Sequence, residues 1–434
     1  MENQRPSWTS RGAFILAAVG SAVGLGNIWR FPYIMGQNGG AVFLIIYLLL
    51  IMTICFIPLI AELAMGKITK KECIGAFESI NPKFKPIGAL NPLTGILVTS
   101  FYFVVGGWIL NYICLGFSKC NISNFSEYFS SFTQEPLTNC VLTQLFLFIC
   151  IFFTARGLKK GIEFANNILM PMFAVILIIL IISSLQLPNA YLGLEYMFKP
   201  DFSKINAHMF LVALGQALFT LSIGMGALFT YGSYIKEDSS ITKSAYTIIF
   251  SDTFFAIMAG IMIFPAIFSF GLQPDSGAGL VFVTLPYIFA QIHHGGLISV
   301  LFFVLLLAAA VTSGISMLEV SIAVFTERFK ISRIKSCVLL FFIISILAIP
   351  AALSFGLLND VTIIGKTVFD FLDFATSNIL MPLNAFFVCI IAGWFLHVKG
   401  ILFIKNKFFA RLFDFGLKYA VPLILLGLLY IGLK

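Results

Sequence analysis

The amino-acid sequence predicts an all-α polytopic membrane protein with eleven transmembrane helices, arranged as a 5+5 inverted repeat and one extra helix. Three observations predict this fold class. Of the 434 residues, 59% are hydrophobic and only 11% are charged, whereas soluble domains carry about 25% charged residues. The charges are clustered and leave eleven apolar stretches between them. The first and sixth of these stretches are each interrupted near their middle by small residues.

Each apolar stretch is long enough to cross the hydrocarbon core of a bilayer, which takes about 20 residues as a helix. No hydrophilic stretch between them is long enough to form a separate domain, so we expect a single membrane domain over residues 1–434. Its first repeat is expected over about 10–194, its second over about 205–397 and the extra helix over about 410–433. The predicted spans are 12–29, 41–61, 87–118, 136–155, 164–194, 205–235, 244–274, 295–326, 336–359, 367–396 and 412–433.

The 27 Lys and Arg residues test this number of spans, because cytoplasmic loops carry an excess of positive charge. With the N-terminus in the cytoplasm, 21 of them fall on cytoplasmic segments and five outside, and Arg30 lies within the membrane. One missed span would invert every later loop and remove this asymmetry. We therefore expect a cytoplasmic N-terminus and an external C-terminus. The net charge of +8 then reflects topology and contact with the lipid bilayer rather than a nucleic-acid partner.

Neither the N-terminus nor the cysteines indicate further processing or a metal site. The first span has no small-residue cleavage site and continues toward a second span, so we expect it to stay in the mature protein. The eight cysteines show no metal-ligand spacing, and most lie in apolar stretches where Cys behaves as a small hydrophobe. Cys120 and Cys140 flank a loop expected on the oxidising side, and the sequence leaves their pairing open.

The interruptions of the first and sixth spans point to a binding site. The first runs from Gly20 to Asn27 and the second from Thr220 to Gly226. Paired breaks in two oppositely oriented halves are typical of transporters built as inverted repeats, with the site at the breaks. Close packing of helices against small residues is the alternative, but it does not explain why the polar residues Asn27 and Arg30 lie at the same depth.

Several motifs resemble the signature of the neurotransmitter:sodium symporter family, and they occur in the same order along ten spans. The opening motif, which comprises segments 8–11 and 20–33, is long and specific. The matching segments are 8–11 (WTSR), 20–33 (GSAVGLGNIWRFPY), 38–40 (NGG), 100–102 (SFY), 107–108 (GW), 216–222 (QALFTLS), 230–234 (TYGSY), 309–313 (AAVTS) and 373–378 (DFATSN).

This resemblance implies a LeuT-type fold and a sodium-coupled symporter that imports a small, mostly apolar amino acid, aliphatic or aromatic, by alternating access. It also implies a place in the bacterial inner membrane. The chain departs from the family pattern in two ways. It stops after eleven spans where the structural model of the family has twelve, and Asp252 stands where many relatives carry Asn, with a one-residue gap in the alignment beside it.

The resemblance implies two sodium sites. One would use the hydroxyls of Thr312 and Ser313 with the carbonyls of Gly20, Val23 and Ala309. Sodium is a hard cation that prefers oxygen ligands, and unwound backbone and hydroxyls supply them. For the two hydroxyls taken alone, bonding back to their own helix is the alternative.

The other sodium ion would lie between the carbonyl of Ala22, the side chains of Asn27, Thr220 and Asp252, and the carboxylate of the substrate. Because the ion completes its shell only when the amino acid is bound, each ligand would raise the affinity of the other. The alternative for Asp252 is a protonated, hydrogen-bonded structural acid, since a charge within the membrane costs about 2.5–3.5 kcal/mol on insertion scales. If Asp252 is ionised, it supplies the negative charge that relatives recruit as chloride, so we expect transport that does not require chloride.

The substrate is expected at the two breaks. The amides of Leu25 and Gly26 and the Tyr102 hydroxyl would hold its carboxylate, because a half-helix N-terminus favours negative charge. The carbonyls of Ala22 and Phe219 and the Ser222 hydroxyl, beside Thr220, would hold its ammonium group. The resemblance assigns the side-chain pocket to Val98, Phe219, Met225 and Met317, all apolar, and ordinary helix packing is the alternative for each.

Two charged pairs resemble the gates of the family, Arg30 with Asp373 outside and Arg5 with Glu327 inside, the latter near Trp8, Ser233 and Tyr234. Exposed ion pairs contribute only about 0–1 kcal/mol and can therefore form and break easily. Glu62 and Glu319 are further acids within spans, and we interpret both as hydrogen-bonding supports for unwound backbone.

Three other classes of protein are alternatives to a symporter. A channel is disfavoured because no repeated filter motif is present. An intramembrane enzyme is disfavoured because the four His residues show no metal spacing and no nucleophile and base arrangement. A transport-dead amino-acid sensor with the same fold remains the alternative to a symporter. The sequence leaves open which amino acid is carried, the sodium stoichiometry, proton countertransport and the oligomeric state.

Overall fold

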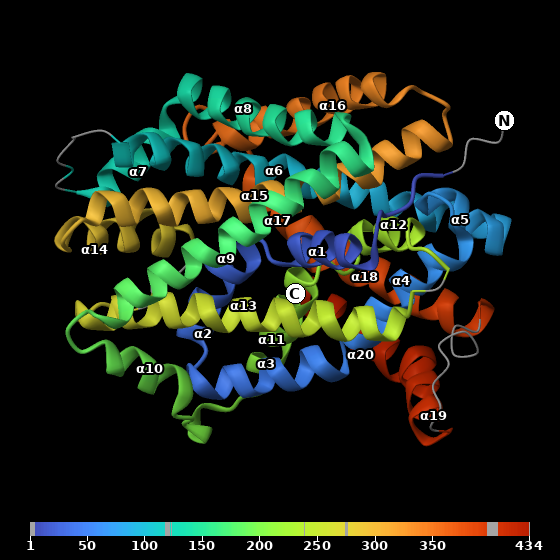
Figure 1. Cartoon of the computed structure of the whole chain (residues 1–434), viewed down its shortest axis with the longest axis horizontal. Helices are drawn as coiled ribbons and strands as arrows, with labels where there is room; N and C mark the ends of the chain where they lie inside the picture. Colours follow the sequence, from blue (N-terminus) through green and yellow to red (C-terminus); the bar gives the residue numbers. More distant parts are fainter. Residues whose placement is uncertain are drawn as a thin grey trace.

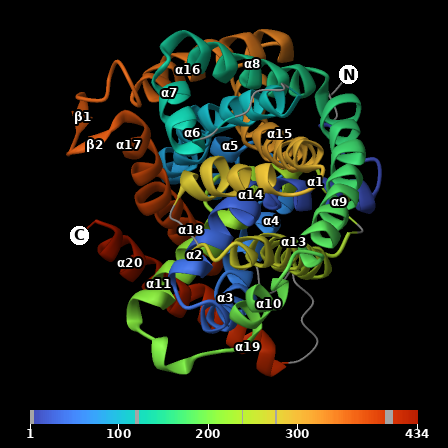
Figure 2. The same ribbon diagram turned by 90° about the vertical axis from the view of Figure 1, so that its left-hand side faces the viewer.

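Long helices running side by side make up almost the whole molecule (Figure 1). The computed structural model describes residues 5–117, 122, 124–237, 239–273, 277–396 and 407–433. Helices α6 and α15 make the most extensive contact with each other, and both are largely buried. Viewed from one end, α4, α14 and α15 lie near the centre, whereas α9, α16 and α20 lie at the periphery (Figure 2).

The first half of the chain contains ten α-helices and four short 3-10 or π-helical segments within the described residues. They are α1 (Arg11–Ala22), η1 (Gly26–Arg30), α2 (Phe31–Gln37), α3 (Ala41–Thr53), α4 (Phe56–Thr69), α5 (Cys73–Ile80), η2 (Pro82–Phe84), α6 (Lys85–Phe117), α7 (Phe125–Gln134), α8 (Pro136–Ala155), η3 (Leu158–Glu163), α9 (Phe164–Leu185), α10 (Ala190–Phe198) and η4 (Phe202–Lys204).

The second half contains ten further α-helices and one two-stranded antiparallel hairpin in the described ranges. Its elements are α11 (Ala207–Thr220), α12 (Ala227–Ser233), α13 (Ile241–Ser269), η5 (Leu280–Thr284), α14 (Leu285–Gln291), α15 (Gly295–Glu327), α16 (Arg333–Leu353), β1 (Thr362–Ile363), β2 (Lys366–Thr367), α17 (Val368–Phe374), η6 (Ala375–Leu380), α18 (Met381–Ile390), η7 (Ile391–Phe395), α19 (Lys407–Phe415), η9 (Gly416–Ala420) and α20 (Val421–Gly432).

The described residues hold nine helical segments long and apolar enough to cross a membrane, and one further pair, Arg11–Ala22 with Gly26–Gln37, that is bent by 48°. Helices α11 and α12 are individually too short to span, but they follow each other in the chain on either side of the break at 221–226. Counted as one broken span, they bring the number to the eleven predicted from the sequence.

Local signals place the helix ends. Ser10 caps α1, with its side-chain oxygen accepting a 3.1 Å hydrogen bond from the Ala13 amide, and Asn206 caps α11 in the same way through the Met209 amide. Such caps satisfy amides that have no partner within the helix. Several predicted boundaries were wrong, and that of the fifth span differs most. The span expected over 164–194 ends at Leu185, because Pro188 and the left-handed Asn189 (φ 60°) turn the chain into the separate helix α10.

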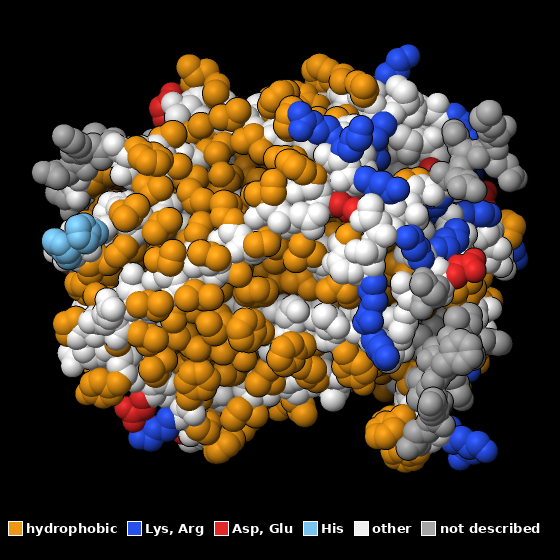
Figure 3. Space-filling view, viewed as in Figure 1, with side chains coloured by type: hydrophobic (Ala, Val, Ile, Leu, Met, Phe, Trp, Pro, Cys, Tyr) orange, Lys and Arg blue, Asp and Glu red, His pale blue; other side chains and the backbone are white. Residues whose placement is uncertain are grey.

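Lys and Arg side chains gather toward one end of the molecule, on the side where the N-terminus lies, and the middle of the visible face is mostly hydrophobic (Figure 3). Many large apolar side chains are exposed, among them Val175, Ile178 and Ile182 of α9. An exposed apolar girdle of this kind is what a bilayer covers.

Candidate functional site

The candidate site lies where α1 and α11 break. Helix α1 ends at Ala22 and regular structure resumes at Gly26. The chain after α11 passes through three residues with positive φ, Ser222 (54°), Gly224 (81°) and Gly226 (77°), before α12 begins. Glycine adopts such angles without strain, so the sequence itself stops the helix here. The backbone groups freed by the two breaks face each other inside the bundle.

Close approach between these segments requires glycine. A Cβ atom at Gly24 would lie 2.5 Å from the Ser313 hydroxyl oxygen, and one at Gly26 would lie 3.2 Å from the Phe219 ring. The Gln216 side chain ties the segments together by donating a 2.9 Å hydrogen bond to the Gly26 carbonyl. The small residues that interrupt the spans therefore allow α15 and α11 to reach the backbone of the first span.

All ten residues predicted to bind the substrate line one small cavity at the breaks. Ser21, Gly24 and Ser313 complete its lining. Of these, Ser21 was not singled out from the sequence, although it lies within the first family motif. The ten predicted residues are Ala22, Leu25, Gly26, Val98, Tyr102, Phe219, Thr220, Ser222, Met225 and Met317.

The cavity has a polar end and an apolar end. At the polar end, the Ser222 hydroxyl donates a 3.1 Å hydrogen bond to the Ser21 carbonyl. The Tyr102 hydroxyl is buried beside this backbone and makes no hydrogen bond to another described residue. At the apolar end, Val98, Met225 and Met317 are all at least 96% buried. A buried hydroxyl without a partner is costly, so the polar end is suited to receiving a polar ligand.

Asp252 lies beside the cavity, on α13, with its carboxylate surrounded by donors. Its Oδ1 atom accepts hydrogen bonds from Asn27 Nδ2 (2.8 Å) and Thr220 Oγ1 (3.0 Å), and its Oδ2 atom accepts a longer one (3.4 Å) from the Tyr47 hydroxyl. The side chains of Asn27, Thr220 and Asp252 predicted to hold one sodium ion therefore lie together.

Two of the residues predicted for the other sodium ion, Gly20 and Ser313, meet between α1 and α15. The Ser313 hydroxyl lies 3.1 Å from the Ser21 carbonyl oxygen and 3.4 Å from that of Gly20. The Thr312 hydroxyl bonds back to its own helix, at 3.1 Å from the Ala308 carbonyl and 3.0 Å from that of Ala309. A hydroxyl that donates its one hydrogen keeps lone pairs for a cation, so this arrangement fits sodium and the back-bonding alternative alike.

The two predicted gates differ. The structure brings Arg5 and Glu327 together at 3.1 Å, with Arg5 also over the ring of Tyr234. On the other side, Arg30 lies over the Phe219 ring at 4.3 Å, while Asp373 accepts a hydrogen bond from Ser377. Within the described part of the chain these two residues form no ion pair. In this structure the outer pair is thus separated and the inner pair is joined.

The inner gate borders a cavity that carries many positive charges. Arg5, Lys70 and Arg328 line it together with Glu327. Burial lowers the pKa of Lys70, and repulsion from Lys67 lowers it further. This excess of positive charge matches the positive-inside expectation for a cytoplasmic surface.

A second attachment of the N-terminal segment was missed in the sequence. The Thr9 amide donates a 2.9 Å hydrogen bond to Glu163 Oε1, and the Thr9 hydroxyl donates one of 2.5 Å to Oε2. Glu163 is 96% buried and ends the π-helical turn η3 that begins α9. Beside these contacts, Trp8 donates its indole N–H to the Tyr231 carbonyl at 3.0 Å. We call the contact between Thr9 and Glu163 the N-terminal latch.

One of the two acids expected to support unwound backbone does so, and the other does not. Glu62 Oε1 accepts a 2.7 Å hydrogen bond from the Gly224 amide in the break after α11. The interpretation of Glu319 was wrong: its carboxylate pairs with Arg333 and accepts a 2.9 Å hydrogen bond from the Tyr234 hydroxyl. Because a buried carboxylate needs a counter-charge, a cation near the end of the neighbouring span holds it instead of backbone amides. Of the two loop cysteines, Cys140 carries a free thiol, and Cys120 lies outside the described residues.

The breaks, the cavity between them and the oxygen-rich clusters at its edge define a class of membrane protein. The Sodium:neurotransmitter symporter family matches residues 5–122 and 124–432, and the chain belongs to this family.

Individual relatives cover nearly the whole chain. An uncharacterized sodium-dependent transporter of Bacillus subtilis is 36% identical over 395 residues, which are 89% of this chain and 88% of that protein. Another from Haemophilus influenzae is 34% identical over 443 residues, 98% of this chain and 97% of its own length. The crystal structure of MhsT in complex with L-phenylalanine superposes with a TM-score of 0.91 at 41% sequence identity, covering 99% of this chain and 100% of MhsT.

These similarities confirm the predicted family and the predicted fold class, an all-α membrane protein with the LeuT-type fold. The chain is a multi-pass, sodium-dependent symporter and not an enzyme.

Proposed function

We propose that this symporter imports an apolar L-amino acid, aliphatic or aromatic, together with two sodium ions. The observation that carries the proposal is the single cavity that brings the predicted substrate-binding residues together, polar at the breaks and apolar toward Val98, Met225 and Met317. Neither end of the cavity presents a charged side chain in its lining. A zwitterion with an uncharged side chain suits such a site, since backbone dipoles and hydroxyls can hold both of its charges.

The chemistry of the apolar end favours this substrate class. MhsT, a protein 41% identical to this chain, was crystallised in complex with L-phenylalanine. Burying an aromatic or large aliphatic side chain contributes about 1.5–3 kcal/mol, and the flexible Met225 and Met317 can adapt to either shape. A polar side chain would lose hydration there without gaining partners.

Sodium coupling at this site follows from shared ligands. Asn27, Thr220 and Asp252 form one cluster beside the polar end, and a substrate carboxylate would complete the shell of an ion bound there. The second ion would lie between Ser313, the Gly20 carbonyl and the other predicted ligands on α1 and α15. Because an ion and a substrate that share a shell stabilise each other, binding of the amino acid should strengthen with sodium.

Binding measured in two salts tests the proposal. Purified protein is titrated with leucine and phenylalanine in sodium chloride and in potassium chloride, and the thermal unfolding midpoint and the Kd are followed. A ligand that binds only the folded state raises the midpoint, so sodium should raise the affinity and the midpoint together. Equal affinity in both salts would contradict sodium coupling at this site. Binding without uptake in vesicles would instead favour the alternative function, an amino-acid sensor.

We further propose that the protein lies in the bacterial inner membrane with its positively charged end in the cytoplasm. Supporting this orientation, Lys and Arg gather at the end that carries the N-terminus and the inner gate (Figure 3). Cytoplasmic loops retain positive charge during insertion. The outer gate residues Arg30 and Asp373 would then face the periplasm.

A further inference from the structure

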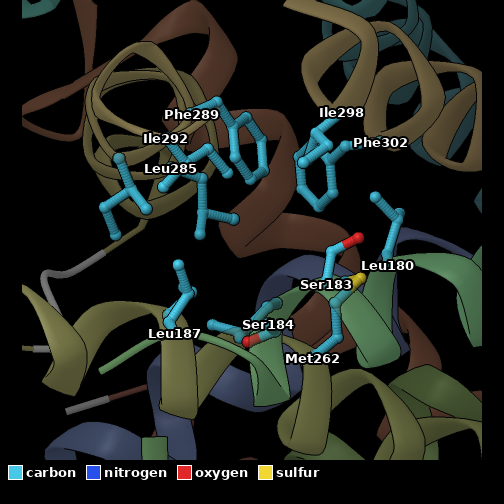
Figure 4. Close-up of a pocket in the computed structure, with 13 residues that line it drawn as sticks. Leu180, Ser183, Ser184, Leu187, Met262, Leu285, Phe289, Ile292, Ile298 and Phe302 are labelled. Atoms are coloured by element: carbon cyan, nitrogen blue, oxygen red, sulfur yellow. The ribbon is translucent and has the colours of Figure 1, made fainter. Parts of the chain in front are cut away.

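Helix α9 carries two buried side chains with a polar atom that has no hydrogen-bond partner among the described residues, Asn166 near its start and Ser184 near its end. They lie about 27 Å apart along the helix axis. Ser184 lines a small apolar cavity of about 20 Å³ (Figure 4), which has room for about one water. Because Ser183 lines the same cavity, two hydroxyls can hold that water. Ser184 therefore needs no further ligand, and Asn166 is the side chain to be explained.

The orientation of the Asn166 amide is fixed by its nitrogen atom. Nδ2 donates a 2.9 Å hydrogen bond to the carbonyl of Ile162, one turn earlier in the chain. Reversing the amide would set two oxygen acceptors against each other, so Oδ1 points away from this carbonyl. The side chain is fully buried, and Oδ1 accepts no hydrogen bond from any described residue. A buried amide oxygen without a partner is costly, so this atom is suited to receiving a ligand.

The Oδ1 atom of Asn166 faces Gly20 of α1. A Cβ atom added to Gly20 would lie 2.1 Å from Oδ1. With a carbon–carbon bond of about 1.5 Å, Oδ1 lies within about 3.6 Å of the Gly20 Cα atom, and no water fits between atoms in contact. The Gly20 carbonyl is one of the groups predicted to bind sodium, and its oxygen lies 3.4 Å from the Ser313 hydroxyl. Asn166 thus approaches the predicted sodium site from α9, which packs against both α1 and α15.

Two simpler roles explain the position of this oxygen poorly. The Cα–H group of Gly20 can donate to Oδ1, but such contacts are weak and do not replace an ordinary hydrogen bond. Packing alone would be served as well by a leucine, which has a similar size and brings no polar atom into the interior. Neither role accounts for an oxygen that is buried beside a predicted sodium ligand.

Asn166 lies on the side of the sodium site that faces the N-terminal latch. It follows Glu163 by three residues, which corresponds to about 4.5 Å along the helix, and residues with this spacing lie on the same helix face. Glu163 accepts the hydrogen bond of the Thr9 amide in the latch. Asn166 therefore lies between the latch and Gly20, where an ion released from the site toward the N-terminal segment would pass.

We infer that Asn166 is a further sodium ligand, whose Oδ1 atom joins the oxygens of Gly20 and Ser313 around the ion between α1 and α15. The last torsion of an asparagine side chain has a broad energy minimum, so Oδ1 can turn toward the ion while the backbone stays in place. An amide carbonyl is among the oxygen ligands that hard cations bind. The inference rests on the proposed sodium site and adds to it a residue from α9.

Sodium titrations test the inference. The purified full-length protein is titrated with sodium at constant ionic strength, with potassium as the replacement, and leucine and phenylalanine binding and the thermal unfolding midpoint are followed. The unfolding midpoint is also followed without amino acid, so this measurement does not depend on the proposed substrate. Asn166→Leu keeps the size of the side chain and removes Oδ1. The matched control Asn167→Leu makes the same change at the next residue, whose side chain is exposed.

We expect the half-maximal sodium concentration to rise at least about fivefold in Asn166→Leu, the change that one hydrogen bond of ordinary strength produces. Asn167→Leu should keep the wild-type value. At saturating sodium, the Kd of Asn166→Leu for the amino acid should return to that of the wild type, because excess sodium fills the weakened site. If Asn166→Leu does not fold, Asn166→Ala removes the same oxygen with a smaller side chain.

The variant Thr312→Ala with Ser313→Ala separates this inference from the sodium site on which it rests. A shift of the sodium midpoint in this double variant but not in Asn166→Leu would keep the site and show that Asn166 is not a ligand. No shift in either variant would contradict the site and the inference together. Amino-acid binding by Asn166→Leu that stays weak at saturating sodium would indicate a structural role and would also overturn the inference.

Discussion

The charge of Asp252 carries the first prediction at the scale of residues. This residue is fully buried, and three side chains direct donors at it: Asn27, Thr220 and Tyr47. An ionised carboxylate is an acceptor only, and this surrounding matches it. Two sodium ions and a zwitterion would bring a net charge of about +2 into a region of low dielectric constant, where uncompensated charge is expensive. A fixed negative charge at Asp252 compensates part of it.

The corresponding prediction concerns chloride. Uptake by the wild type should be equal in sodium chloride and sodium gluconate, because Asp252 already supplies the negative charge. Asp252→Asn keeps the shape and removes the charge, so sodium-dependent uptake should weaken and any remaining uptake should respond to chloride. Uptake into vesicles in the two salts measures both effects. A chloride requirement in the wild type, or an Asn variant that works equally well without chloride, would mean that Asp252 is a structural acid.

A second prediction for individual residues concerns the Thr312 and Ser313 hydroxyls of α15. It distinguishes sodium binding by these hydroxyls from bonding back to their own helix. Thr312→Ala combined with Ser313→Ala should abolish sodium-driven uptake while the protein stays folded, because the ion loses both hydroxyl ligands. Thr326→Ala is the matched control: its hydroxyl bonds back to the Ile322 and Ala323 carbonyls of the same helix in the same way. Uptake and thermal unfolding of both variants are compared. Unimpaired concentrative uptake by the double variant would leave only back-bonding as the role of these hydroxyls.

Individual site residues could be predicted from the sequence where a continuous motif carries them. The segment 20–27 and the residues around Thr220 lie in such motifs, and their side chains meet in one cavity. The N-terminal latch could not be predicted, because Thr9 and Glu163 are 154 residues apart and no periodicity links them. Glu319 was misinterpreted for a related reason, since its partner Arg333 belongs to the next helix.

At the scale of elements, breaks were easier to predict than irregular helical turns. Glycine and positive φ explain the interruption after Thr220. The π-helical turn η3 itself contains no residue with positive φ. Gly157, with φ 84°, lies directly before it but does not show that a π-helical turn follows. This turn joins α8 to α9 and carries Glu163, so the latch connects the N-terminal segment to an irregular part of the bundle. An irregular turn is a place where a helix can rearrange at low cost.

The latch gives a prediction about sodium affinity. If the closed inner gate is the state that holds sodium, loosening the latch should weaken apparent sodium binding. Thr9→Val removes the hydroxyl donor, and a hydrogen bond to a charged group contributes about 1.5–3 kcal/mol. We therefore expect the sodium concentration for half-maximal amino-acid binding to rise about tenfold or more. The conservative variant Thr9→Ser keeps the hydroxyl and should resemble the wild type. An unchanged sodium midpoint in Thr9→Val would show that the latch is only structural.

In the whole molecule, the distribution of charge and the number of spans together determine the membrane topology. Lys and Arg gather at one end (Figure 3), and Arg5 and Glu327 line one cavity with Lys70, Arg328 and Arg333. The charge pattern was readable from the sequence because every loop contributes to it. The packing of the bundle was not, since nearly all stretches are apolar on every side and only the tertiary contacts separate the buried α6 and α15 from the exposed α20.

The number of spans decides on which side the chain ends. Within the described residues, nine continuous spans and the bent pair at the start make ten, and an even number would return the C-terminus to the side of the N-terminus. The broken pair α11 and α12 supplies the eleventh only if the break at 221–226 lies within the membrane rather than at its surface. We predict that it does, because Glu62 of α4 and Asn384 of α18, both at most 1% exposed, hold the Gly224 amide and carbonyl inside the bundle. A fluorescent protein fused to the N-terminus should then fluoresce in the cytoplasm, and alkaline phosphatase fused after residue 434 should be active in the periplasm. A second phosphatase fusion after residue 396 keeps the first ten spans and should be inactive. Activity at 396 and none at 434 would mean that α11 and α12 enter and leave on the same side, and the assignment of every later loop would have to be reversed.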